Sequence, residues 1–161
     1  MPYSTHGETR KAYMGIDPGA SGGLALIDGC EIEAVAMPAT ERDIWLWVSA
    51  EHVDFAVIEQ NTGYVGGEGN PGSAMFKFGR SAGLLTMALV AAGVPYEEIT
   101  PGQWQKKLGI PPRKKGEAKG AFKNRLKAEA QRLFPRIPVT LKTADALLLA
   151  EYARRKAEGK L

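Results

Sequence analysis

Three acidic residues lie where their side chains could hold a metal ion. Asp17 and Glu59 each follow a short apolar run, and Asp145 stands at the start of a longer apolar segment. Carboxylates that converge repel one another unless a cation neutralises them, and such hard oxygen ligands suit Mg²⁺ or Mn²⁺. Each acid alone also fits an ordinary turn or helix start. The prediction of a metal site therefore rests on the three together.

The elements that must position these acids follow from the hydrophobic pattern and the turn signals. Strands are expected at residues 13–16, 23–28, 31–37, 55–58 and 94–99. Helices are expected at residues 41–52, 74–92, 101–108, 121–133 and 143–156. Thr40 and Thr143 are candidate N-caps of the first and last helices.

The order of these elements predicts an α/β fold with a mixed five-stranded sheet and helices on both faces. Three early strands joined by tight turns should be antiparallel, and later strands separated by helices should be parallel with right-handed crossovers. If the strands that precede Asp17 and Glu59 are neighbours, both acids lie at the edge where open α/β sheets bind ligands.

Length and composition indicate a globular protein of ordinary type. The 161 residues, 44% hydrophobic and 24% charged, suit one domain over residues 12–161, with the polar residues 1–11 as a disordered extension. The single cysteine, Cys30, excludes an internal disulfide framework and disfavours a zinc site of thiolates. No apolar run approaches the ~20 residues of a membrane span. We expect a cytoplasmic protein without a membrane partner.

The small net charge of +3 conceals a strong asymmetry. Residues 1–100 carry five Lys and Arg against 13 Asp and Glu, whereas residues 101–136 carry 11 against two. An acidic part beside a strongly basic segment suits a protein that binds metal in one place and a polyanion in another. A solvated basic helix face would account for the same charges.

Several short motifs, taken in order, resemble the RuvC family of Holliday junction resolvases, and its bacteriophage branch in particular. They are GIDPG at 15–19, IEQ at 58–60, FGRSAGLLTMALVAAG at 78–93 and ADAL at 144–147. The resemblance runs from about residue 12 to residue 155. It implies a ribonuclease-H-like fold and a homodimer that resolves four-way junctions and related branched DNA by paired nicking, in recombination and repair. It also implies a bacterial host cytoplasm if the protein is phage-encoded.

The resemblance assigns roles to the acids. Asp17, Glu59 and Asp145 match the family's metal-binding and catalytic residues. Two Mg²⁺ or Mn²⁺ ions would share Asp17, one activating a water and the other stabilising the departing 3′ oxygen.

Lys142 departs from the family pattern. Three residues before the last aspartate the family has Asp or His, and a protonated lysine cannot bind a metal. Its ammonium could steady the water or the phosphate as a catalytic point cation, or it could point to solvent; both interpretations remain open.

Basic residues and one aromatic residue are candidates for DNA binding. Mobile cations on a Gly- and Pro-rich loop suit contacts to phosphate. By the resemblance, Lys119 falls where the family carries a lysine. Tyr64 lies close to the position at which the family stacks an aromatic residue on bases at the junction centre. The set is Tyr64, Lys106, Lys107, Arg113, Lys114, Lys115, Lys119 and Lys123.

The long helix expected at residues 74–92 is too apolar for one core-facing stripe. Gly79 and Gly83 are one turn apart, so this helix is the expected homodimer interface.

Three alternatives share parts of this pattern. An actin-like ATP-binding fold also has Asp and glycines in its first hairpin. That fold needs a second, duplicated domain, for which the 161 residues leave no room, so no nucleotide cofactor is expected. A structure-specific DNA-binding protein with weakened catalysis would explain Lys142. A relative acting on RNA or flaps would have the same fold, so function must rest on the site.

Overall fold

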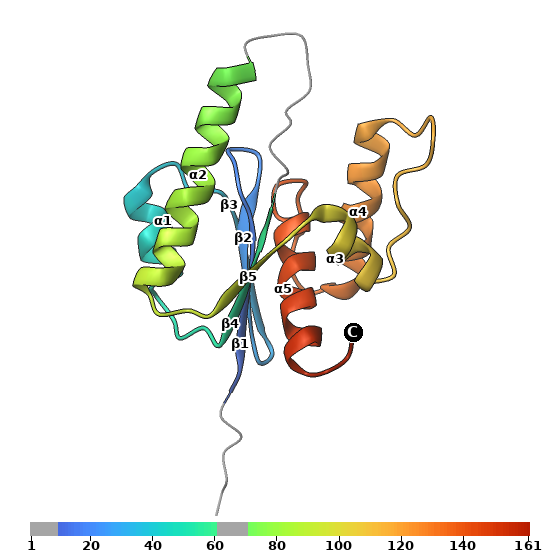
Figure 1. The fold of residues 1–161 in the computed structure, drawn as a ribbon. Coiled ribbons are helices and arrows are strands. Elements are labelled where there is room, and N and C mark those ends of the chain that lie inside the picture. The colour runs from blue at the N-terminus through green and yellow to red at the C-terminus, as the bar shows by residue number, and fades with distance from the viewer. Residues whose placement is uncertain (1–9, 61–70) are drawn as a thin grey trace, which may run out of the picture.

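The computed structural model describes residues 10–60 and 71–161, and within them the chain forms one mixed sheet with helices on both faces (Figure 1). The strands are β1 (Ala12–Asp17), β2 (Gly23–Asp28), β3 (Glu31–Ala36), β4 (Phe55–Glu59) and β5 (Tyr96–Ile99), in the order β3-β2-β1-β4-β5. β1 pairs antiparallel with β2, and β2 with β3, whereas β1–β4 and β4–β5 are parallel. The predicted α/β sheet is confirmed.

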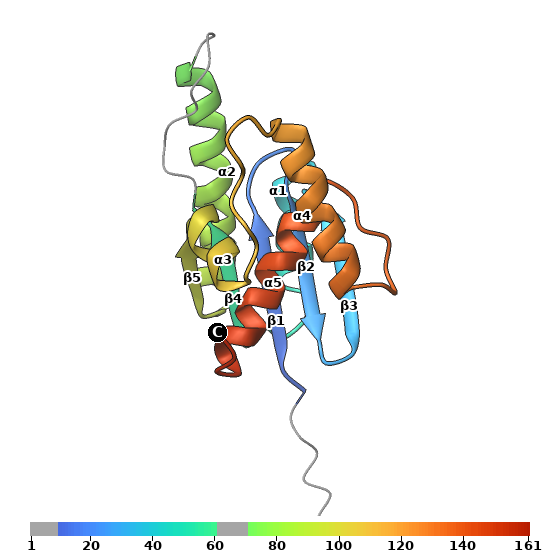
Figure 2. The ribbon, with the colours of Figure 1, turned by 90° about the vertical axis from the view of Figure 1, so that its right-hand side faces the viewer.

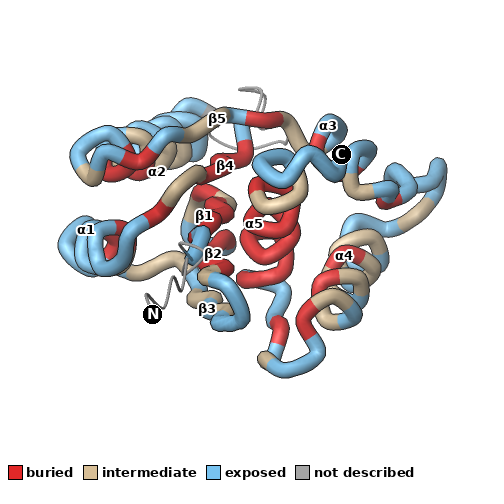
Figure 3. Tube along the Cα trace, turned by 90° about the horizontal axis from the view of Figure 1, so that it is seen from below, coloured by how far each residue is buried: buried red, intermediate tan, exposed pale blue. Residues whose placement is uncertain are grey.

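In the described part of the chain, five helices cover the sheet in two layers. They are α1 (Glu41–Val48), α2 (Pro71–Ala91), α3 (Pro101–Lys107), α4 (Lys119–Leu133) and α5 (Ala144–Ala157). Figures 1 and 3 show α1 and α2 on one face and α3, α4 and α5 on the other. Among the described helices none is long and apolar enough to cross a membrane.

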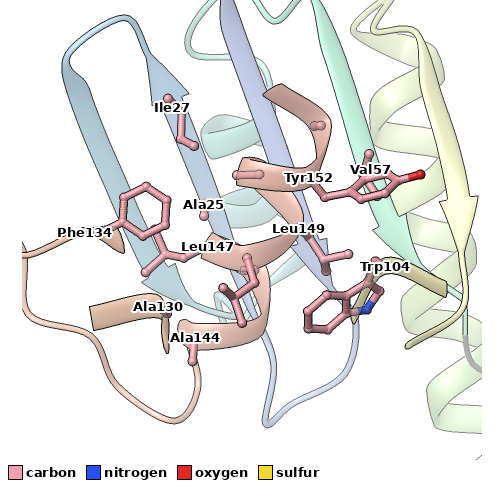
Figure 4. Packing of buried hydrophobic residues seen from close by; sticks show 14 of the residues in the cluster. Ala25, Ile27, Val57, Trp104, Ala130, Phe134, Ala144, Leu147, Leu149 and Tyr152 are labelled. Carbon is pink, nitrogen blue, oxygen red and sulfur yellow. The ribbon is translucent and has the colours of Figure 1, made fainter. Parts of the chain in front are cut away.

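The central helix α5 carries the core of one face. Its residues from Ala144 to Ala153 are all buried, and they pack with Trp104 of α3, Leu126 of α4 and Val57 of β4. Figure 4 shows Leu147 and Leu149 of α5 between the sheet and the neighbouring helices. Each large buried side chain contributes roughly 1.5–3 kcal/mol by leaving water, so these contacts hold α5 firmly on the sheet.

A glycine in β1 lets α5 lie directly on the sheet. A Cβ at Gly15 would be 2.0 Å from the carbonyl oxygen of Ala146 and 2.3 Å from the backbone nitrogen of Ala150. No side chain fits in that space, because real Cβ atoms do not approach backbone so closely. The contact fixes the start of α5 beside the end of β1, where Asp17 lies.

Local signals explain most of the element boundaries. The turn after Asp28 is a two-residue hairpin with Gly29 at φ +58°, as the Asp-Gly pair predicts. Thr40 caps α1 by accepting a hydrogen bond from the backbone of Asp43 at 3.1 Å. Thr143 also stands at the N-cap of its helix, but its hydroxyl bonds to Thr140 instead of capping.

Four boundaries differ from the sequence expectation by two residues or more, one of them the start of α2, which lies at Pro71 rather than at residue 74. Helix α1 ends at Val48 rather than at residue 52, because the buried stripe of Ile44 and Val48 stops there. Strand β5 begins at Tyr96 rather than at residue 94, since Pro95 has no N–H to donate to the ladder. Helix α4 begins two residues early, at Lys119.

Candidate active site

The ends of two parallel strands bring Asp17 and Glu59 together. Ile16 of β1 pairs with Ile58 of β4, so the acids that follow them emerge at the same edge of the sheet. This edge is the upper end of the molecule in Figure 1. The neighbouring, parallel arrangement on which the sequence prediction depended is present.

The third acid arrives from the start of α5. The turn before this helix packs on β2 so closely that a Cβ at Gly23 would lie 2.5 Å from the carbonyl oxygen of Lys142. That approach, with the contact at Gly15, sets Asp145 beside the strand ends. Its side chain is buried, and one carboxylate oxygen, Oδ1, has no hydrogen-bond partner among the described residues.

The electrostatics of the site show that the three carboxylates act on one another. Burial, and then the charges of Glu59 and Asp145, raise the pKa of Asp17 to about 8. Burial also raises the pKa of Glu59, a shift that a hydrogen bond from Trp104 opposes and the charge of Asp145 reinforces. Carboxylates perturbed by each other in this way are characteristic of catalytic or metal-binding sites.

A hydrogen bond from Trp104 orients the side chain of Glu59. Its indole nitrogen donates a 2.9 Å hydrogen bond to Oε2 of Glu59, and the indole itself is fully buried. Figure 4 shows this ring in the core beside Leu149. The sequence gives no signal for this hydrogen bond, because the two residues are 45 positions apart.

A lysine from α4 enters the acid cluster. The ammonium of Lys123 donates to Oδ2 of Asp145, and α4 packs along α5 (Figure 2). Burial lowers the pKa of Lys123, but attraction to Asp145, the hydrogen bond to it and the charges of Asp17 and Glu59 outweigh burial and raise the pKa overall. Lys123 was expected among the DNA-contacting residues. In the structure it lies beside the three acids, where it contacts Asp145.

The donor types fit a hard divalent cation. Oδ1 of Asp145 has no hydrogen-bond partner among the described residues, and the raised pKa of Asp17 shows that its ionised form lacks a sufficient nearby positive charge; a bound cation would satisfy both. As they stand, no three His, Cys, Asp or Glu side chains in residues 10–60 and 71–161 are arranged as a formed metal-binding group. Asp17, Glu59 and Asp145 are thus the residues that could hold an ion once drawn together by its charge.

Lys142 does not lie on the helix that carries Asp145. Helix α5 begins at Ala144, so Lys142 precedes the helix and shares no helical face with Asp145. Lys142 is exposed in the preceding turn and lines the cleft above the acids.

A cleft of about 1710 Å³ opens over the three acids. Its walls come from α2 on one side and from α4 and the turn before α5 on the other. Basic side chains on these walls are Lys77, Arg80, Arg113, Lys119, Lys123 and Lys142. Arg80 is paired with Glu41 at 2.9 Å.

The predicted DNA-binding residues divide into three groups. Arg113, Lys119 and Lys123 line the cleft, and Tyr64 lies outside the described residues. The remaining four are exposed but do not line it: Lys106, Lys107, Lys114 and Lys115. Lys77 and Arg80 were missed, although their spacing of three on one helix could have placed them on a common face.

Solved structures of other proteins have a fold similar to that of this chain. No protein-family model and no curated protein matches this sequence. Among solved structures, RuvC of Thermus thermophilus matches with a TM-score of 0.63 and 18% identity, covering 92% of this chain and 97% of that one. The chain has the RuvC fold. T. thermophilus RuvC in complex with a Holliday junction substrate matches at a TM-score of 0.62 and 18% identity over 93% and 97% of the two chains.

The match to RuvC confirms the predicted ribonuclease-H-like architecture of a five-stranded mixed sheet between helices. An identity of 18% establishes the fold alone. The chemical role of each side chain must therefore be argued from the contacts in this chain.

Proposed function

We propose that this protein is a structure-specific, metal-dependent endonuclease that resolves four-way junctions and related branched DNA. One observation carries the proposal: Asp17, Glu59 and Asp145 lie together in a cleft with basic walls, and burial raises the pKa of both Asp17 and Glu59. The RuvC fold supports it, because one RuvC structure is a complex with a Holliday junction substrate. The proposal includes membership of the bacteriophage branch and action in recombination or repair within a bacterial host cell.

The catalytic residues proposed are Asp17, Glu59 and Asp145, which would hold Mg²⁺ or Mn²⁺. A bound ion would supply a polarised water and neutralise charge on the phosphate. In the reaction a water oxygen attacks phosphorus, the bond to the 3′ oxygen breaks, and the products are a 5′-phosphate and a 3′-hydroxyl. Trp104 would keep Glu59 oriented during this displacement.

The basic walls suit the phosphate backbone. Phosphate contacts supply most of the affinity for DNA and carry no sequence information, which fits a protein that recognises the shape of a junction. Lys119 and Arg113 would contact strands inside the cleft. The exposed Lys106, Lys107, Lys114 and Lys115 would contact the flanking arms, and Tyr64 would stack on bases at the junction centre.

An exposed stripe on α2 supports a homodimer. Phe76, Gly79, Gly83, Met87 and Val90 recur at spacings of three and four, so they share one face of the helix. The three larger side chains are 71%, 59% and 55% exposed, and a Cβ at either glycine would touch nothing. Two copies related by a twofold axis would bury this stripe and present two sites to opposed strands.

A second candidate function is a junction-binding protein with weakened catalysis. It is favoured by two lysines at the site: Lys142 stands where a metal ligand is expected, and Lys123 is bound to Asp145. It retains the cleft and the dimer but predicts binding without nicking.

Binding and nicking assays on one synthetic junction separate these candidates. We expect tight binding of the junction over linear duplex, and cleavage only after Mg²⁺ or Mn²⁺ is added. Asp17→Asn should bind as well as the parent or slightly better, since a negative charge facing phosphate is removed, and should not cleave. Binding without cleavage by the parent protein would favour the second candidate, and cleavage by Asp17→Asn would refute the site.

A further inference from the structure

The two oxygens of Asp145 have different surroundings. Oδ2 accepts a hydrogen bond from the ammonium of Lys123, whereas Oδ1 is buried with no partner among the described residues. A metal ion held by Asp145 would take one of these two oxygens as its ligand. Here one oxygen is already taken by a protein cation, so Asp145 offers one oxygen to a metal.

The two carboxylate oxygens of Glu59 also have different roles. Its Oε2 accepts the hydrogen bond from the buried indole of Trp104, which leaves Oε1 as its other possible metal ligand. Asp17 supplies the third carboxylate that lines the same cleft. Mg²⁺ commonly binds to one or two protein carboxylates and completes its octahedron with waters and substrate phosphate.

The net charge of the three acids and Lys123 also favours a single divalent ion. With all three acids ionised, the carboxylates carry three negative charges and Lys123 carries one positive charge, which leaves two for a single divalent cation. The position at which further negative charge would be expected is occupied by Lys142, and Lys142 lines the same cleft.

We propose that Lys123 is a built-in cation that takes the place of a second divalent ion, so that the site binds one metal ion. The proposal rests on the proposed nuclease function and departs from the two-ion arrangement that the resemblance implies. Lys123 holds Asp145 in place through one of the three donors of its ammonium. Its side chain is 40% exposed toward the cleft, so the remaining donors can reach an oxygen of a bound phosphate.

The number and affinity of bound Mn²⁺ ions test this proposal without relying on activity. Mn²⁺ titration of the purified protein, followed by electron paramagnetic resonance and calorimetry, should give one ion per chain. Lys123→Gln removes a positive charge next to the ion and frees Oδ2, so Mn²⁺ should bind at least about tenfold more tightly. Lys123→Glu adds a fourth carboxylate and should bind two ions per chain.

Lys127→Gln is the matched control, because it makes the same charge change one turn further along α4 and outside the cleft. Its Mn²⁺ affinity should stay within twofold of the parent value. Lys123→Arg, which keeps the positive charge, should bind one ion with affinity close to that of the parent. Circular dichroism of each variant confirms that it is folded before titration.

Two results would overturn the proposal: two Mn²⁺ ions per chain in the parent protein, or Lys123→Gln binding Mn²⁺ no more tightly than Lys127→Gln. Failure of the underlying function is separate. If the parent protein cleaves junctions with Mn²⁺ while Lys123→Gln has unchanged affinity, only the role of Lys123 is wrong. If the parent neither binds Mn²⁺ nor cleaves, the proposed function itself is wrong.

Discussion

Replacing Trp104 with phenylalanine separates its hydrogen bond to Glu59 from its packing. The bond is 2.9 Å long and joins a fully buried donor to a carboxylate that is 8% exposed, so no water can replace the lost partner easily. A hydrogen bond to a charged group is worth about 1.5–3 kcal/mol. The smaller ring also leaves a cavity that costs about 1 kcal/mol.

We therefore expect Trp104→Phe to lower the free energy of unfolding by about 3 kcal/mol. For a domain of this size that corresponds to a fall in Tm of roughly 10 °C. The hydrogen bond stabilises the ionised form of Glu59, and without it burial would raise the pKa of Glu59 further. The loss should thus be largest above the pKa of Glu59 and should shrink as the pH falls through it.

Urea denaturation at several pH values, with a chelator present, measures this dependence. Trp47→Phe is the control, because Trp47 is a half-buried tryptophan that packs on the opposite face of the sheet. Its cost should be small and independent of pH. If Trp104→Phe also showed a pH-independent cost no larger than that of the control, the indole would be a packing residue only, and its role in orienting Glu59 would be refuted.

The remaining predictions concern four other features. In chelator, the raised pKa of about 8 keeps Asp17 protonated in the folded protein, whereas the unfolded chain releases this proton near pH 3.8. The free energy of unfolding should therefore fall as the pH rises between these two values. Asp17→Asn should remove most of this fall in urea titrations. Gly15→Ala should cost more than about 4 kcal/mol, or prevent folding, because its Cβ meets backbone; a normal melting curve would contradict the close contact. Gly83→Gln should give a folded monomer by light scattering, whereas an unchanged mass would exclude this face as the interface. Neutralising Lys114 and Lys115 together should reduce the salt dependence of DNA binding by about one to two units of slope, and an unchanged slope would place that loop away from DNA.

The parts of the site that depend on strand order could be predicted from the sequence. Asp17 and Glu59 follow apolar runs, and the topology rules for antiparallel hairpins and parallel crossovers suffice to bring two such strand ends together. Asp145 could be placed at the start of a helix, but its approach to the strands depends on the contact of α5 with Gly15, for which a single glycine gives no sequence signal.

The contacts of Trp104 and Lys123 could not be predicted in the same way. Each depends on how one helix packs beside another element far along the chain, and neither leaves a periodic pattern. A lysine in a basic segment is more often a surface residue, so Lys123 was grouped with the phosphate-contacting residues. The structure adds a contact that the sequence does not indicate, its hydrogen bond to Asp145. Tyr64, which lies outside the described residues, stays a prediction.

Mapping of nicks on an immobile four-way junction tests the central claim most directly. Each arm is labelled in turn, and the parent protein is compared with Asp145→Asn in Mg²⁺, in Mn²⁺ and in chelator. The account predicts paired nicks at symmetrical positions on two opposed strands, each leaving a 5′-phosphate, only with metal and only with the parent protein. Equal cutting of linear duplex, or nicking by Asp145→Asn at the parent rate, would contradict it.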